Sequence, residues 1–155
     1  MSGDLVVSPQ EVWKFGTQER VQRGTPLALY ARVDGNAAAD RRTTFRRHRT
    51  TAGYQVTAGR TLIITRALYF ATAANPSMDL VDGTDDLGLN SAGTHAGEVL
   101  NDAPGGGGGG PLRSEVAQRL YDVPYYVEVP AGRFFSLRLI ATAAIVVITV
   151  FGVEV

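Results

Sequence analysis

The sequence contains no cysteine and only two histidines among its 155 residues. Without cysteine there is neither a disulfide nor a zinc–thiolate site, so stability must come from packing and hydrogen bonds. The histidines, His48 and His95, stand apart, and no Gly-x-Ser-x-Gly motif is present. Two separated histidines offer few candidates for a Ser-His-Asp triad, and they cannot form the histidine cluster that a metal-binding barrel needs. We expect no enzyme, no metal and no cofactor.

Lysine is nearly absent too. Lys14 is the only one, the other fourteen basic residues are arginines, and fifteen acidic residues bring the formal net charge to zero. A formal net charge of zero argues against a protein whose whole surface binds nucleic acid. Arginine is favoured at interfaces because its planar guanidinium makes bidentate contacts, although the base composition of the genome explains the bias equally well.

Long apolar helices are also missing. Residues 139–153 carry no charge, but a spanning helix needs about 20 apolar residues. Residues 145–150 are all Ile, Val or Thr, which favour a strand. The opening residues, MSGDLVVSPQ, lack the basic start and apolar core of a signal peptide. We predict a buried strand near the C-terminus and no membrane contact.

Strand and turn patterns occupy most of the chain. Apolar and polar residues alternate, β-branched runs recur, and Gly- or Asp-rich turns separate them, which is typical of an all-β protein. The predicted strands are 25–33, 43–51, a short one that ends before the turn at Ala58-Gly59, 60–72, 125–129, 134–140 and 145–155. Short strands could also lie at 78–81 and 98–100, inside a long loop. Residues 114–121 fit a helical turn or a strand equally well.

Two short segments resemble each other closely. VTAGRTLII begins at Val56 and VPAGRFFSL at Val129, and in each a strand leads through Ala-Gly-Arg into an apolar strand. We expect Gly59 and Gly132 to shape tight corners, where glycine avoids a side-chain clash. Matched corners in the two halves of one chain favour a jelly-roll-like β-sandwich, which consists of two Greek keys. The alternative is coincidence, since Ala-Gly is a common turn.

An arm precedes the first predicted strand. The motif SPQE, beginning at Ser8, has the pattern of a helix start, and the two-turn helix that would follow carries Trp13 and Phe15. So short a helix needs a surface to pack on. We predict an N-terminal arm or helix over residues 1–24 and a single jelly-roll domain over 25–155.

A long loop is expected at about 73–111, because Gly, Asn, Asp and Pro recur there and break any regular pattern of apolar residues. Its six consecutive glycines lack the Lys-Ser/Thr that a phosphate-binding loop requires. Its aspartates do not have the spacing of the twelve-residue calcium loop, so solvated turns are the simpler interpretation. These are Asp79, Asp82, Asp85 and Asp86.

A cluster of arginines is the sharpest charged feature. It consists of Arg41, Arg42, Arg46, Arg47 and Arg49. A solvated edge strand protected by charge explains it without any partner, and docking on an acidic protein surface explains it equally well. Nucleic acid ranks third, because Phe45 is the only aromatic residue in the cluster and no supporting fold motif is present.

The stretch VEVPAGRFFSLRLIATAAIVVITVFGVEV, residues 127–155, resembles the C-terminal half of small jelly-roll capsid decoration (cement) proteins of tailed bacteriophages. The resemblance implies a structural virion protein on the outer capsid surface. Such a protein would bind the major capsid protein as a homotrimer, stabilise contacts between capsid subunits and have no active site. Trp13 and Phe15 of the arm and the arginine cluster would then be docking residues.

The same fold leaves a second function open, a phage tail or receptor-binding module that recognises a surface glycan. Exposed tyrosines near the acidic loop would favour it. The available ones are Tyr54, Tyr69, Tyr121, Tyr125 and Tyr126.

Overall fold

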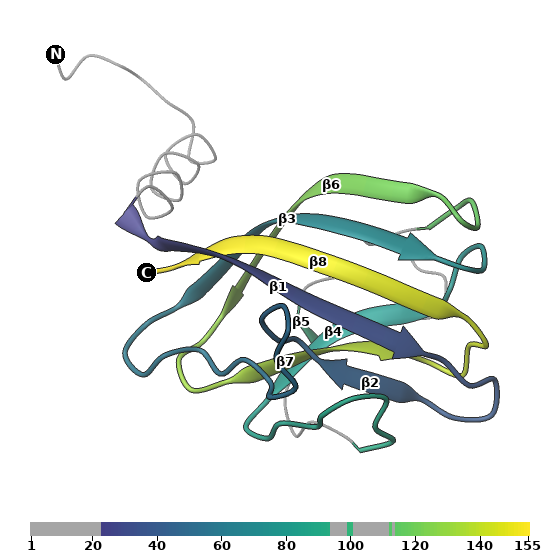
Figure 1. Cartoon of the computed structure of the whole chain (residues 1–155), viewed down its shortest axis with the longest axis horizontal. Coiled ribbons are helices and arrows are strands. Elements are labelled where there is room, and N and C mark those ends of the chain that lie inside the picture. The colour runs from purple at the N-terminus through teal and green to yellow at the C-terminus, as the bar shows by residue number, and fades with distance from the viewer. Residues whose placement is uncertain (1–22, 94–98, 101–111, 113) are drawn as a thin grey trace, which may run out of the picture.

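The computed structural model describes residues 23–93, 99–100, 112 and 114–155 (Figure 1). Eight β-strands make up most of this part of the chain. They are β1 (Thr25–Asp34), β2 (Arg41–Thr44), β3 (Leu62–Ala71), β4 (Met78–Gly83), β5 (Val99–Leu100), β6 (Leu120–Val129), β7 (Phe134–Leu139) and β8 (Ile145–Glu154). Alternation and β-branched runs in the sequence predicted β1, β3, β7 and β8 at nearly their observed bounds, but only the second half of β6. Strands β4 and β5 interrupt the loop predicted at about 73–111, and the short strand predicted before Ala58-Gly59 is irregular chain instead.

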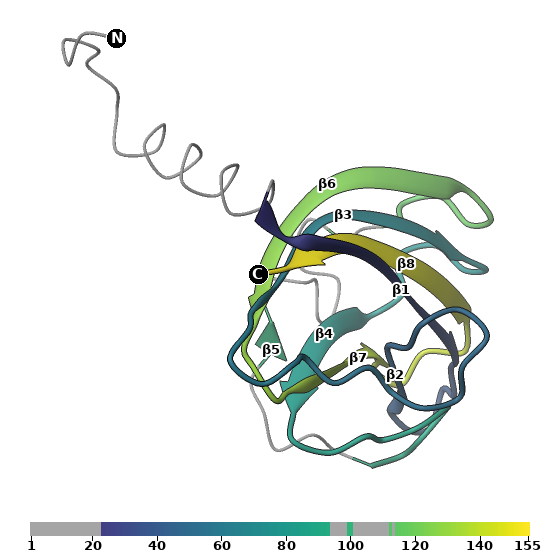
Figure 2. The ribbon, with the colours of Figure 1, turned by 60° about the vertical axis from the view of Figure 1, so that its left-hand side comes forward.

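Two four-stranded antiparallel sheets form the two layers seen in Figure 2. The order in the first, here called the front sheet, is β1-β8-β3-β6, and the order in the second, the back sheet, is β2-β7-β4-β5. Strand β1 pairs with β8, β2 with β7, β3 with β6 and β4 with β5. A long hairpin rolled up so that its strands pair in this nested way is a jelly roll. The predicted fold class, an all-β jelly-roll sandwich, is confirmed.

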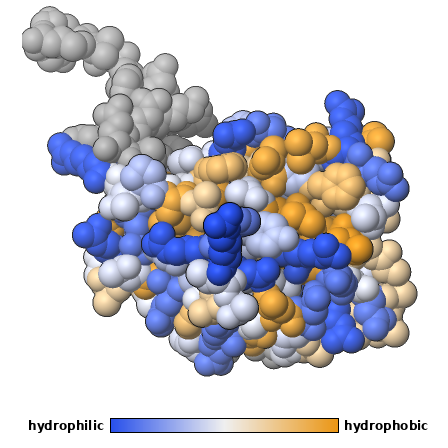
Figure 3. Space-filling model, viewed as in Figure 1, coloured by the Kyte–Doolittle hydropathy of each residue, from blue (hydrophilic) through white to orange (hydrophobic). Residues whose placement is uncertain are grey.

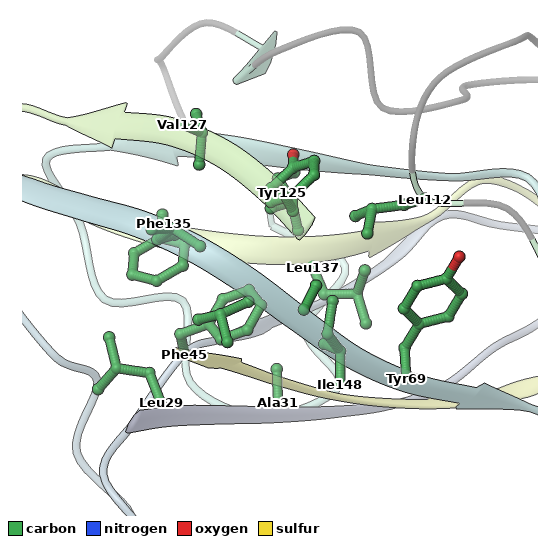
Figure 4. Packing of buried hydrophobic residues seen from close by; sticks show 14 of the residues in the cluster. Leu29, Ala31, Phe45, Tyr69, Leu112, Tyr125, Val127, Phe135, Leu137 and Ile148 are labelled. Carbon is green, nitrogen blue, oxygen red and sulfur yellow. The ribbon is translucent and has the colours of Figure 1, made fainter. Parts of the chain in front are cut away.

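The core fills the space between the sheets. Side chains of alternate residues point inward from both sheets, as the period of two along a strand requires (Figure 4). Phe45 and Phe135 stack at the centre, with ring centroids 4.3 Å apart and no exposed surface. Each such side chain contributes about 1.5–3 kcal/mol by leaving water, so the sandwich needs no disulfide.

The two Ala-Gly-Arg corners lie side by side. Gly59 and Gly132 both have a φ of +75°, the left-handed conformation that only glycine adopts without strain. The amide of Val56 donates to the carbonyl of Arg133 at 2.9 Å, and the carbonyl of Val56 accepts from Gly132 at 2.8 Å. The repeat in the sequence therefore corresponds to two matched corners joined by hydrogen bonds.

The predicted strand over 43–51 is wrong. Strand β2 ends at Thr44 because Phe45 turns into the core, and the chain then makes a turn in which Thr50 donates to the carbonyl of Arg47 at 3.2 Å. Arg49 has a φ of +64°, which no strand contains. The ambiguous segment 114–121 is mostly a bend and turn, and only Leu120 and Tyr121 belong to β6. Of the predicted arm over 1–24, residues 1–22 lie outside the described residues, as does the glycine run.

Candidate functional site

The part of the chain that the structure describes holds no cluster of metal-binding side chains. No three His, Asp or Glu side chains there are grouped to hold an ion. The loop aspartates have other partners: Asp79 binds Arg138, Asp82 lies 4.0 Å from Nε of Arg133, and Asp86 accepts from backbone amides. Within the same residues, no helix is long and apolar enough to span a membrane.

Arg42 belongs to a buried charge cluster on the back sheet. Only 4% of it is exposed, and its Nη1 donates to the carbonyl of Gly93 at 2.7 Å. Across the sheet Arg138 holds Asp79 by two hydrogen bonds, which raise the pKa of Arg138. Burial lowers the pKa of Arg42, and the nearby charge of Arg138 lowers it further. Arg42 therefore has its guanidinium inside the fold, hydrogen-bonded to Gly93, and presents almost none of its side chain at the surface.

The other arginines of the 46–49 stretch form an ordered turn, residues 46–50, here called the arginine turn. Arg46 exchanges two backbone hydrogen bonds with Tyr30 at 2.8 and 3.0 Å, and its guanidinium lies 5.2 Å from the centroid of that tyrosine ring. Arg47 lies at the same distance from Tyr54. Arg47 and Arg49 are exposed. Among the described residues, no carboxylate forms an ion pair with any of the three.

The segment after the arginine turn is fixed to β8 by Glu154. This carboxylate accepts hydrogen bonds from the hydroxyl of Tyr54 at 2.6 Å, the amide of Thr57 at 2.7 Å and Oγ1 of Thr57 at 2.8 Å. Burial alone would raise the pKa of Glu154, but these hydrogen bonds hold it below its usual value. Burial and the bond to Glu154 raise the pKa of Tyr54 to about 12. The turn is therefore presented rigidly.

A second surface lies on the outside of the front sheet, where Figure 3 shows apolar atoms over β3, β6 and β8 beside a hydrophilic border along β1. Its members are apolar residues whose side chains point away from the core. They are Leu68 and Phe70 of β3, Leu120 of β6, and Val147 and Phe151 of β8, together called the apolar face. Phe70 lies opposite both Val147 and Leu120. Leu120 is 63% exposed and the others are half-buried.

One ion pair interrupts the apolar face, since Asp122 lies opposite Leu68 in the strand register, and a second pair borders it. Arg66 binds Asp122 through two hydrogen bonds of 2.7 Å, and its guanidinium covers Phe151 at 4.8 Å from the ring centroid. Arg32 binds Asp34 at 2.9 Å at the border. The sequence carried a signal for this face: β8 is apolar at nearly every position, which is typical of a strand covered on both sides.

The other predicted site residues are scattered. Arg41 is half-buried at the far end of β2, away from the arginine turn, and Trp13 and Phe15 lie outside the described residues. Of the five tyrosines, Tyr69 and Tyr125 are buried, and Tyr54 and Tyr121 pack against the core. The hollow beside Tyr54 measures about 210 Å³, less than the pockets that usually hold small ligands. This geometry gives little support to glycan recognition.

Comparison with known proteins identifies no relative. No family model matches the sequence, and neither a curated protein nor a solved structure is similar to it. Function is therefore inferred from the chain's own residues.

Proposed function

We propose that the protein is a structural virion protein, a capsid decoration (cement) protein. It binds the outer capsid surface and stabilises contacts between major capsid subunits. The observation that carries the proposal is the arginine turn, a rigid cationic projection from a jelly roll. The resemblance of residues 127–155 to decoration proteins supports the virion setting.

The arginine turn fits a protein partner with an acidic surface. Its guanidinium groups meet no carboxylate among the described residues, so the charge of Arg47 and Arg49 is available to another molecule. Stacking on tyrosine rings and the bonds to Glu154 hold the turn in place before binding. Such preorganisation lowers the entropy lost on docking, and complementary charge speeds and orients the encounter.

A docking role also accounts for the sandwich itself. A jelly roll offers a rigid body that can bridge neighbouring subunits. The predicted arm would add a second contact, through Trp13 and Phe15, to that of the turn. A rigid body that makes two weak contacts at once binds far more strongly than it would through either contact alone.

Capsids assembled without this protein provide the test. We expect the wild-type protein to bind them and to raise their resistance to heat, with an affinity that falls as salt is added. The double variant Arg47→Ala/Arg49→Ala should bind about tenfold more weakly, because each rim charge contributes up to about 1 kcal/mol. The matched control is Arg32→Ala/Arg119→Ala, which removes two exposed arginines elsewhere.

Either of two results would contradict the proposal. One is a wild-type protein that does not bind such capsids at low salt. The other is an Arg47→Ala/Arg49→Ala variant that binds as tightly as its control, which would remove the arginine turn from the docking surface.

A further inference from the structure

We propose that the hollow beside Tyr54, here called the Tyr54 hollow, binds a single glutamate side chain on a loop of the partner, with Arg47 holding its carboxylate. The proposal rests on the docking role of the arginine turn and names the chemical group that the turn would bind. It is argued from the size of the hollow, from the donors on its wall and from backbone strain in the turn.

The size of the Tyr54 hollow suits one side chain. Its volume is about 210 Å³, whereas sites for whole small molecules have about 300–1,000 Å³. Its wall consists of Arg47, Thr50, Ala52, Gly53, Tyr54 and Gln55. The planar guanidinium of an arginine binds a carboxylate through two parallel hydrogen bonds. Two methylene groups let a glutamate reach deeper into such a hollow than an aspartate can.

Several donors on the wall already have acceptors. These are the amides of Gly53 and Tyr54, the hydroxyls of Thr50 and Tyr54, and the side-chain amide of Gln55. The guanidinium of Arg47 differs, because it forms neither a hydrogen bond nor an ion pair with any residue that the structure describes. A ligand in the hollow therefore meets a cation that still lacks an acceptor, which favours an anionic group.

Two carboxylates bonded to the wall favour a ligand with one negative charge. Asp86 accepts from the amide of Gly53 at 2.7 Å, and Glu154 accepts from the hydroxyl of Tyr54 at 2.6 Å. Both repel anions, and the repulsion doubles for a phosphate dianion. Binding to a nucleic-acid backbone also needs cations that contact successive phosphates. A side-chain carboxylate is therefore the better match.

Backbone strain supports a binding role for the arginine turn. Arg49 has a φ of +64°, a conformation that glycine or asparagine adopts more readily than arginine does. Strain of this kind concentrates at functional sites. Arginine at this position puts a second cation beside Arg47, and Arg49 too forms no ion pair with a described residue. Its charge explains its presence, since the backbone there does not favour it.

Nuclear magnetic resonance titration of the isotope-labelled full chain tests the site without any capsid. The probe is the α-amide of N-acetylglutamic acid, which has one carboxylate, and its neutral glutamine counterpart is the control ligand. We expect saturable shifts of the Gly53 and Gln55 amides, with a dissociation constant on the order of 1–10 mM because one ion pair supplies most of the binding. The glutamine ligand should bind at least about tenfold more weakly.

Arg47→Ala should weaken binding of the probe by about tenfold or more. Arg119→Ala is the matched control, because Arg119 lies 5.4 Å from the ring of Tyr121 much as Arg47 lies 5.2 Å from that of Tyr54, but beside the beginning of β6. It should bind the probe like the wild type. Equal losses in the two variants, or a probe that leaves the Gly53 amide unmoved, would overturn the proposal.

Arg49→Gly separates binding from folding. Glycine removes the strain at this position, so the variant should be at least as stable in urea as the wild type but should bind the probe several-fold more weakly. Gln118→Gly is its control, because Gln118 also has a positive φ, +59°, and lies outside the arginine turn. It should leave binding unchanged. Equal affinities for the two glycine variants, or a large loss of stability in Arg49→Gly, would overturn the role of Arg49.

The remaining outcomes distinguish this site from the docking role itself. Binding to capsids with no response to the glutamate probe would leave the docking role standing and overturn the glutamate site. A response to the probe with no binding to capsids would overturn the docking role and leave the site. A stronger response to inorganic phosphate than to the probe would overturn the carboxylate as ligand.

Discussion

Replacing Glu154 with glutamine tests how the arginine turn is held on the sandwich. Glutamine has the same length but no charge. Its carbonyl oxygen can still accept from Tyr54 and from the amide of Thr57, which share Oε1 of Glu154, whereas the Thr57 hydroxyl can keep its bond only by accepting from the new amide group.

The expected loss follows from these contacts. A hydrogen bond to a charged group contributes about 1.5–3 kcal/mol, and three bonds on one carboxylate are not additive. Because all three bonds lose the charge of their acceptor, Glu154→Gln should lower the free energy of unfolding by about 2–3 kcal/mol. For a domain of this size each kcal/mol shifts the melting temperature by about 2–4 °C, so we expect a decrease of about 5–10 °C in circular dichroism melts at pH 7.

The pH dependence gives the stricter test. The folded state holds the pKa of Glu154 below its ordinary value, so its stabilising effect is complete above the pKa of an unfolded glutamate, about 4.3. The effect is lost as the pH falls through the lower, folded pKa. The difference between wild type and Glu154→Gln should therefore be constant near neutrality and shrink in acid.

Asp85→Asn is the control, since it removes a carboxylate from an exposed loop. It should change stability by less than about 0.5 kcal/mol. The reasoning fails if Glu154→Gln melts like this control, or if its deficit is as large at pH 3 as at pH 7.

Three further substitutions test the fold by chemical denaturation. Gly59→Ala should cost about 1 kcal/mol, because its φ of +75° is strained for alanine although nothing lies within 4 Å of the added carbon; a neutral result would mean that the corner relaxes. Gly152→Ala should cost about 3 kcal/mol or prevent folding, because the new Cβ would lie 2.2 Å from the carbonyl oxygen of Ile63; wild-type stability would contradict that close approach. Phe45→Ala should cost about 3–5 kcal/mol by emptying the space beside Phe135, and a loss below about 1 kcal/mol would contradict the stacked core.

The sequence was sufficient to predict the jelly roll because its signals are local. Alternation along 25–33 and the glycine corners depend on neighbouring residues, and the structure has strands and corners there. The predicted strand over 43–51 was wrong because the conformation there depends on a residue far away in the sequence. Threonine and arginine are compatible with an edge strand, but Phe45 is drawn into the core by Phe135, ninety residues away along the chain.

The candidate surfaces could be predicted only in part. The arginine cluster was visible in the sequence, but its division into a buried Arg42 and an exposed turn depends on contacts with Gly93 and Tyr30. The apolar face needs the register of three strands before its members come together. The role of Glu154 was invisible, since its partners are about a hundred residues distant.

The place of β8 in the front sheet has a consequence for how the protein is made. This strand lies between β1 and β3, which do not touch each other in the sheet order. During synthesis β1 emerges first and has no front-sheet neighbour until β8 leaves the ribosome. Pairing of such distant segments is slow, and the unpaired strands are exposed meanwhile. Because Glu154 lies in β8, the arginine turn also becomes anchored only at that last step, so an unfinished chain should be unable to compete with complete protein for its binding sites.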